Sequence, residues 1–209
     1  MKLLFDAANT LIHKPKLFTS VNNVLHEYGY NIPDDYLIRT HRFVSEVIEF
    51  PDRTNEDFYR DFNSQWLYAL GIIPLPEILD SIYKKCSYLP WEPFEDTNYL
   101  KEIKHSISIL SNFNTNLDEH MNQFFPKIFD TIIVSEKEKV RKPKIEFYEL
   151  AIDRLNVPAS EIIYVGDSIR LDIEPALKLG INAWLIDRTN NFPYFEKRIK
   201  SLTELKNII

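Results

Sequence analysis

The 209-residue chain is poor in cysteine, with Cys86 as its only thiol. One thiol cannot form an internal disulfide or make a zinc site by itself, which excludes a disulfide-stabilised domain and fits a reducing compartment. The first residues lack the basic and apolar regions of a signal peptide, and no uncharged apolar run is long enough to cross a bilayer. We therefore expect a soluble, cytoplasmic protein with no membrane partner, whose cysteine is a buried structural thiol.

The chain also lacks an excess of positive charge. It has 25 Lys and Arg residues against 31 Asp and Glu residues, for a net charge of −6 and a pI near 5.4. Binding to a nucleic-acid backbone depends on clustered Lys and Arg, so we expect no nucleic-acid partner. With 44% apolar residues, the chain can bury one large core or a core domain that carries an insertion.

Glycine is scarce as well, with only four in the chain. Gly29, Gly71 and Gly180 lie at predicted helix ends, and Gly166 follows a predicted strand. Where glycine is this rare, we expect each one to mark a positive φ angle or a close approach of another group to the backbone.

A helical pattern fills the chain from residue 17 to about residue 85. Apolar residues recur there at three- and four-residue spacing, interrupted by proline, glycine and polar capping residues. The pattern predicts four helices, one that closes at Gly29, one from Pro33 to before Pro51, one capped by Thr54–Asp57, and one over Pro76–Lys85. Four consecutive helices suggest a small bundle.

Strands and helices alternate in the rest of the chain. The predicted strands are Leu3–Phe5, Ile107–Leu110, Thr131–Val134, Ile162–Val165 and Ala183–Ile186. The predicted helices are Leu117–Phe125, Ile145–Leu155, Asp172–Leu179 and a short terminal one in Ser201–Ile209. Such alternation is typical of an α/β fold with a doubly wound, mainly parallel, Rossmann-like sheet. We expect residues 1–14 and 92–209 to form this core domain, and residues 15–91 to form an inserted α-helical domain.

Four predicted strand ends carry reactive side chains. Asp6 follows the first strand, Ser111 and Asn112 follow the second, Lys142 follows the third in an Arg-Lys-Pro turn, and Asp167 follows the fourth. Carboxyl ends of parallel strands meet at one edge of a sheet. A carboxylate nucleophile, a hydroxyl, an ammonium group and further carboxylates are the groups that Mg²⁺-assisted phosphoryl transfer requires.

These motifs, in this order, resemble the haloacid dehalogenase-like (HAD) hydrolases with a helical cap inserted after the first motif. That group includes 2-haloacid dehalogenases, phosphoglycolate phosphatases and phosphonoacetaldehyde hydrolases. The resemblance rests on Asp6, Thr10 and Leu11 in FDAANTL, Ser111 in ILSNF, the pair Lys142-Pro143, and Gly166, Asp167, Asp172, Ala176 and Gly180 in YVGDSIRLDIEPALKLGI.

The resemblance implies a role for each catalytic candidate. Asp6 would attack the electrophile and form a covalent aspartyl intermediate. Ser111 and Lys142 would hold the transferring group, and Asp172 would orient Lys142 or a metal-bound water.

It also implies a metal site. Asp6, Asp167 and the backbone carbonyl of Ala8 would bind Mg²⁺, which prefers few carboxylates and an octahedral shell of oxygens. The histidines are scattered without ligand spacing, so we expect no transition-metal site.

Three further residues are candidates for contact with the substrate. Thr10 and Asn112 lie beside the expected site, and each has two open interpretations, a substrate contact or a hydrogen bond within its own turn. Arg42 lies near Arg39 and His41 on one predicted helix and suits an acidic or phosphorylated metabolite. A solvated helix face is the favoured alternative for these helix residues.

Ala8 is where the chain departs from the family pattern. Phosphatases of the family carry an acid two residues after the nucleophile, which protonates the leaving oxygen and later activates water. Dehalogenases usually carry an aromatic residue there, and Ala8 supplies none. Phosphonoacetaldehyde hydrolases do carry alanine but use a cap lysine as Schiff base, and no lysine occurs between Leu17 and Tyr83.

Two interpretations are favoured. A dehalogenase or phosphonatase-like C–X bond hydrolase, and an alanine introduced by engineering, stay open behind them. The first favoured interpretation is a HAD-type hydrolase that acts on a small phosphorylated metabolite through Asp6 and Mg²⁺ but turns over slowly or with help from its substrate. The second is a ligand- or partner-binding pseudoenzyme of the same fold. We expect a monomer or a homodimer in either case.

Overall fold

The computed structural model describes residues 1–209, which form two compact units. Met1–His13 and Pro93–Ile209 make up one, called the sheet unit below, and Lys14–Glu92 make up the other, called the helical unit. The sequence pattern placed the limits of the insertion at residues 15 and 91. The chain leaves and re-enters the sheet unit through two short strands, β2 (Ile12–His13) and β3 (Glu92–Pro93), which pair in a sheet of their own.

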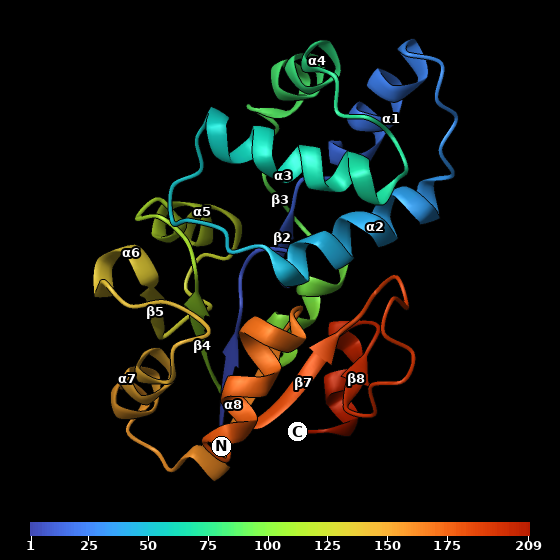
Figure 1. The fold of residues 1–209 in the computed structure, drawn as a ribbon. Helices are drawn as coiled ribbons and strands as arrows, with labels where there is room; N and C mark the ends of the chain where they lie inside the picture. Colours follow the sequence, from blue (N-terminus) through green and yellow to red (C-terminus); the bar gives the residue numbers. More distant parts are fainter. The chain divides into compact units, whose positions relative to one another are not determined.

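The sheet unit is built on six parallel strands in the order β5-β4-β1-β6-β7-β8 (Figure 1). They are β1 (Lys2–Phe5), β4 (Ser106–Ser111), β5 (Thr131–Val134), β6 (Ile162–Gly166), β7 (Asn182–Ile186) and β8 (Arg198–Ile199). The predicted α/β fold with a doubly wound parallel sheet is thus confirmed. Phe5 pairs with Ile109 on one side and Val165 on the other, so Asp6 follows β1 at the point where the strand order reverses.

Helices and short helical turns connect these strands. They are η1 (Glu95–Glu102), α5 (Leu117–Phe124), α6 (Ser135–Glu138), α7 (Ile145–Leu155), η2 (Ala159–Glu161), η3 (Ile169–Ile173), α8 (Glu174–Lys178) and η4 (Leu202–Asn207). Phe147 and Ala151 of α7 and Ala176 of α8 belong to one buried cluster with Leu4 and Leu110 of the central strands. Burial of this apolar face stabilises the unit by about 25 cal/mol for each Å² removed from water.

The helical unit contains the four predicted helices, α1 (Leu17–Glu27), α2 (Asp34–Val47), α3 (Glu56–Ala69) and α4 (Pro76–Cys86) (Figure 1). Asn55 caps α3 by accepting a hydrogen bond from the backbone N–H of Phe58 at 2.9 Å. Gly29 and Gly71 have φ angles of +85° and +76°, as the sequence predicted for glycines at helix ends. The unit has its own apolar core, with Trp66 and Leu67 among its buried residues.

Two predicted elements need correction. The helix expected over residues 172–179 is a π-helical turn, η3, followed by the short helix α8, because Pro175 supplies no N–H and Ser168 caps the backbone N–H of Leu171 at 2.9 Å. The terminal helix is a 3₁₀ helix closed by a capping box between Ser201 and Glu204.

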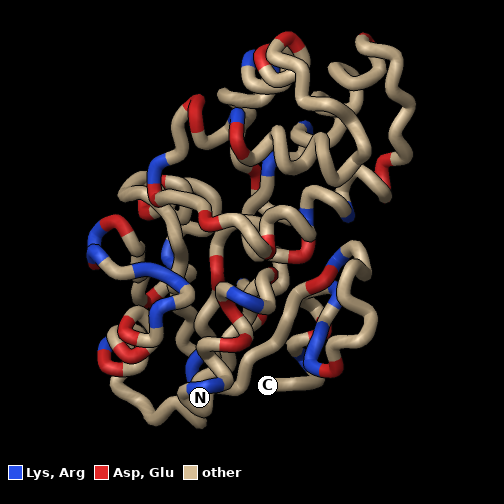
Figure 2. The backbone as a smooth tube through the Cα atoms, viewed as in Figure 1, with Lys and Arg blue, Asp and Glu red and all other residues tan.

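No helix of the structure is both long enough and apolar enough to cross a membrane. Basic and acidic residues are interspersed along the chain in both units (Figure 2).

Candidate active site

Asp6 is the centre of the site. It is 4% exposed, and its backbone N–H donates to the carbonyl of Val165 at 2.9 Å, which fixes the residue to the end of β6. Its Oδ1 accepts hydrogen bonds from Ser111 Oγ at 3.0 Å and Lys142 Nζ at 2.7 Å. Oδ2 accepts no hydrogen bond, so this oxygen is available to an electrophile or a metal ion.

Lys142 is 4% exposed and donates to three acceptors at once. These are Asp6 Oδ1, Asp172 Oδ1 at 2.6 Å and the hydroxyl of Tyr164 at 3.3 Å. Burial by itself lowers the pKa of Lys142, but Asp172 and Asp6 outweigh it and raise the pKa above its ordinary value. The amine therefore stays a charged ammonium group throughout the neutral range.

The backbone of Lys142 is held by Asn112. The Asn112 amide donates to the Lys142 carbonyl at 2.9 Å and accepts from the Lys142 N–H at 2.8 Å. Both polar ends of this side chain are engaged, so the structure shows Asn112 positioning the lysine, where the sequence left open a contact to substrate or a turn hydrogen bond.

Asp172 anchors the far side of the lysine. Its Oδ1 accepts from the Tyr164 hydroxyl at 2.7 Å, and its Oδ2 accepts from the backbone N–H of Ser168 at 2.9 Å. A Cβ added to Gly166 would lie 2.4 Å from the Cβ of Asp172, so glycine is required for this close approach. Burial, followed by the charge of Asp172, raises the pKa of Tyr164 well above its ordinary value, so its hydroxyl keeps its proton.

Three buried carboxylates gather at this edge of the sheet. Ligand oxygens of Asp6, Asp167 and Asp172 lie within 4.8 Å of one another. Lys142 forms ion pairs with both Asp6 and Asp172. Burial raises the pKa of Asp6, Lys142 lowers it and Asp172 raises it, with a net rise. Three carboxylates this close together offer the hard oxygen donors that a divalent cation such as Mg²⁺ prefers.

Thr10 belongs to the sheet unit and Arg42 to the helical unit. Thr10 is fully buried and its Oγ1 has no hydrogen-bond partner, so the turn hydrogen bond considered for it is not formed. Arg42 lies on α2 of the helical unit, 3.5 Å from Glu46, with a side chain only 16% exposed. Of its neighbours on α2, Arg39 is exposed, as expected for a solvated helix face, and His41 packs against aromatic rings, 4.7 Å from Trp66. A contact between Arg42 and substrate stays a prediction.

Sequence reasoning missed Arg188. Its guanidinium donates to both carboxylate oxygens of Asp96, at 3.1 and 2.8 Å, and to the backbone carbonyls of Asn9 and Thr10, at 3.2 and 2.9 Å. It also stacks 3.8 Å from the ring centre of Phe94. These contacts fix the loop after Asp6, in which Asn9 has a φ angle of +59°. The position of an arginine shortly after a predicted strand does not indicate that its partners lie so far away in the chain.

Tyr164 was missed as well. It stands within the buried strand β6, and a buried tyrosine hydroxyl needs a partner. From this requirement the sequence could have predicted a buried hydrogen-bond partner for Tyr164, which the structure shows to be Asp172.

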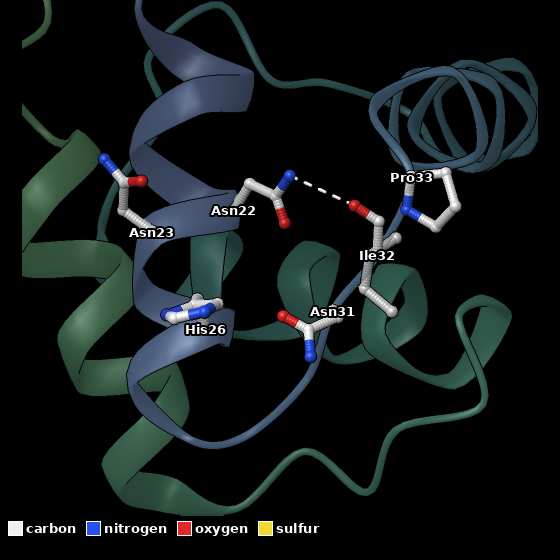
Figure 3. A pocket seen from close by; sticks show the side chains of 6 residues that line it. All are labelled: Asn22, Asn23, His26, Asn31, Ile32 and Pro33. Atoms are coloured by element: carbon white, nitrogen blue, oxygen red, sulfur yellow. Dashed lines mark hydrogen bonds between the residues drawn. The ribbon is translucent and has the colours of Figure 1, made fainter.

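The helical unit has an open hollow of about 290 Å³ between α1 and the start of α2 (Figure 3). The side-chain amide of Asn22 lies in this hollow and donates hydrogen bonds to the carbonyl of Ile32 at 3.1 Å and to Asp34 at 2.7 Å. The residues lining it are Asn22, Asn23, His26, Asn31, Ile32 and Pro33, which include no carboxylate or ammonium group. The hollow therefore lacks the reactive groups found in the sheet unit.

The family model described as haloacid dehalogenase-like hydrolase matches residues 3–186. The chain belongs to this family. Its identity to a glyceraldehyde 3-phosphate phosphatase of Methanocaldococcus jannaschii is 35% over 86 residues, which cover 39% of this chain and 38% of the relative. Its identity to the (S)-2-haloacid dehalogenase 4A of Burkholderia cepacia is 30% over 141 residues, which cover 63% of this chain and 59% of the relative. These matches therefore span roughly two to three fifths of the relatives' lengths.

Solved structures of HAD proteins share the fold. A HAD phosphatase from Thermococcus onnurineus superposes with a TM-score of 0.60 at 21% identity, covering 100% of this chain and 97% of the other. A HAD-type hydrolase from Bacillus subtilis, bound to magnesium, superposes with a TM-score of 0.62 at 18% identity, covering 99% of this chain and 97% of the other. At these identities the likeness establishes the helical-cap HAD fold, while the chemistry has to be argued from the residues.

Proposed function

We propose that the chain is a Mg²⁺-dependent HAD hydrolase that transfers a phosphoryl group from a small phosphorylated metabolite to Asp6. One observation carries the proposal. Asp6 is held through Oδ1 by Ser111 and Lys142, while its Oδ2 accepts no hydrogen bond. A carboxylate fixed at one oxygen and open at the other is arranged for nucleophilic attack. The phosphatase among the chain's sequence relatives supports the same reaction class.

Each residue of the site has a distinct role in the proposed reaction. Asp6 Oδ2 would attack phosphorus, and the Ser111 hydroxyl and Lys142 ammonium would bind the phosphoryl oxygens. Asp172 and Asp6 keep Lys142 charged, and the bonds to Asp172 at 2.6 Å and to Tyr164 at 3.3 Å orient it. When bound by Asp6, Asp167 and the backbone carbonyl of Ala8, Mg²⁺ supplies positive charge that stabilises the phosphoryl oxygens.

Ala8 limits the second half of the reaction. A carboxylate at this position would take a proton from the water that hydrolyses the aspartyl phosphate, and a methyl group cannot do so. A general base contributes about 10²–10⁴-fold, so hydrolysis should be slow by that factor. The same residue favours the second candidate function, a protein of this fold that binds Mg²⁺ and a phosphorylated ligand without turnover.

The test compares hydrolysis of p-nitrophenyl phosphate by the parent chain, Asp6→Asn and Ala8→Asp, with and without Mg²⁺. We expect slow, Mg²⁺-dependent turnover in the parent, none in Asp6→Asn, and a gain of about 10²–10⁴-fold in Ala8→Asp. Calorimetry on the same proteins measures Mg²⁺ binding. If Ala8→Asp gains nothing and Mg²⁺ does not bind, the enzymatic proposal is abandoned. If Mg²⁺ binds and no variant turns over, the binding function is favoured.

A further inference from the structure

The protons around Asp6 are all in use. The single hydroxyl proton of Ser111 goes to Asp6, and that of Tyr164 goes to Asp172 at 2.7 Å. Lys142 has three N–H donors, and its three acceptors are Asp6, Asp172 and Tyr164. Ser111 and Lys142 can redirect a hydrogen bond to a phosphoryl oxygen while keeping their protons. Complete transfer of a proton to a leaving group would instead leave a buried alkoxide, or a neutral lysine between two buried carboxylates, which is costly.

The remaining side chains of the loop after Asp6 supply no acid either. Ala8 ends in a methyl group, and the backbone on both sides of it is held in place, with the N–H of Leu11 donating to the carbonyl of Ala7 at 2.8 Å. Thr10 has a buried hydroxyl with no partner, but an alcohol is far too weak an acid to serve as a general acid at neutral pH. The side chains bonded to Asp6 and the loop that follows it therefore supply a nucleophile and phosphate-binding groups without a proton donor.

We infer that the substrate class of this site is the acyl phosphate, a mixed anhydride of phosphoric and carboxylic acids, and not the phosphate ester of an alcohol. The inference rests on the proposed function, because it presupposes attack by Asp6. It deepens that proposal by naming the group that leaves.

The first step balances without a proton. A bond forms between Asp6 Oδ2 and phosphorus, the bond between phosphorus and the acyl oxygen breaks, and the carboxylate departs with the electron pair. A phosphate ester would instead release an alkoxide, which needs a proton as it leaves. Because substrate and product are both acyl phosphates, the transfer is close to thermoneutral. Because Ala8 supplies no base to activate water, the aspartyl phosphate accumulates and is then hydrolysed slowly.

The test measures the rate of phosphate incorporation at Asp6 in a single turnover, with Mg²⁺ present. Acetyl phosphate serves as the anhydride and ethyl phosphate as the ester. The proteins are the full-length parent, Ala8→Asp, and Ala8→Asn as a matched control of similar size that cannot act as an acid. We expect Ala8→Asp to raise the ratio of the ethyl phosphate rate to the acetyl phosphate rate by about 10²–10⁴-fold. Ala8→Asn should leave this ratio at the parent's value, and circular dichroism verifies that each variant is folded.

The outcomes separate the two proposals. Labelling of the parent by acetyl phosphate, with ethyl phosphate active only in Ala8→Asp, supports the inference. If the parent is labelled by ethyl phosphate within about tenfold of the acetyl phosphate rate, another group supplies the proton, and the acyl-phosphate assignment is overturned while the proposed function stands. If neither donor labels Asp6 in the parent or in Ala8→Asp, the proposed function itself fails.

Discussion

Substitution of Gly166 by alanine should displace the Asp172 side chain and thereby disable the site. The new Cβ would lie 2.4 Å from both Cβ and Cγ of Asp172 and 2.5 Å from its Oδ2. Non-bonded carbon atoms prefer separations of about 3.5–4.0 Å, so Asp172 has to move by roughly 1 Å. That carboxylate is 1% exposed and bonds to Lys142, Tyr164 and the backbone of Ser168, so the movement breaks or lengthens buried bonds.

The size of the effect follows from two contributions. An overpacked core site typically costs about 1–3 kcal/mol. Loss of one hydrogen bond to a charged group adds about 1.5–3 kcal/mol. We expect the free energy of unfolding to fall by roughly 3–5 kcal/mol, which corresponds to a loss of roughly 10 °C in melting temperature for a chain of this size.

The assay is thermal and urea unfolding of Gly166→Ala, with Gly180→Ala as the control. Gly180 has a φ angle of +79° but nothing within 4 Å of an added Cβ, so its substitution costs only the left-handed backbone strain of about 1–2 kcal/mol. Gly166→Ala should also lose Mg²⁺-dependent labelling of Asp6, whereas Gly180→Ala should retain it. Equal destabilisation of the two variants, with labelling intact in Gly166→Ala, would refute the packing argument.

Three further predictions concern groups away from the nucleophile. Burial, followed by the charge of Arg42, lowers the pKa of His41 from 6.5 to about 3, so between these pH values the unfolded chain binds a proton that the folded chain does not. The free energy of unfolding should therefore decline as pH falls from 6.5 towards 3, by up to about 5 kcal/mol, and His41→Leu should lose this dependence in urea titrations. Arg188→Gln should cost about 2–3 kcal/mol and weaken calorimetric Mg²⁺ binding, because it releases the loop that carries Ala8. Burial raises the pKa of Cys86 to about 11 from 9.0, so iodoacetamide should alkylate it about 100-fold more slowly than a free thiol at pH 8, as followed by mass spectrometry.

Each of these has a clear contrary result. An unchanged acid dependence in His41→Leu would mean that other groups control it. Mg²⁺ affinity unaltered in a destabilised Arg188→Gln protein would make the Arg188 contacts structural only. Alkylation of Cys86 at the rate of a free peptide thiol would show that the thiol is not shielded.

The sequence predicted the fold because hydrophobic patterning is local. Buried apolar runs marked the strands, and the rule that parallel strands present their carboxyl ends at one edge predicted that Asp6, Ser111, Lys142 and Asp167 would share that edge. The structure brings Ser111 and Lys142 within 3.0 and 2.7 Å of Asp6. The catalytic roles of these residues stay predictions until they are measured.

What the sequence left out depends on contacts between distant segments. Arg188 reaches the carbonyl of Thr10 from 178 positions away in the chain, and no local pattern encodes that pairing. The π-helical turn over residues 169–173 was also not predicted. A single turn with hydrogen bonds between residues five apart is too short to produce a hydrophobic pattern that differs from that of an α-helix. The role of Asn112 was left open between a substrate contact and a turn hydrogen bond, because its bonds to the Lys142 backbone come from a segment 30 residues away.

The most direct test of the account is rapid-quench labelling of the parent chain with isotopically labelled acetyl phosphate and Mg²⁺, followed by mass spectrometry of the labelled peptide. Asp6 Oδ2 accepts no hydrogen bond and hydrolysis lacks a base at Ala8, so near-stoichiometric phosphate should accumulate on Asp6. The label should be absent in Asp6→Asn. A folded, Mg²⁺-binding parent that takes up no label would contradict the claim that Asp6 is a nucleophile.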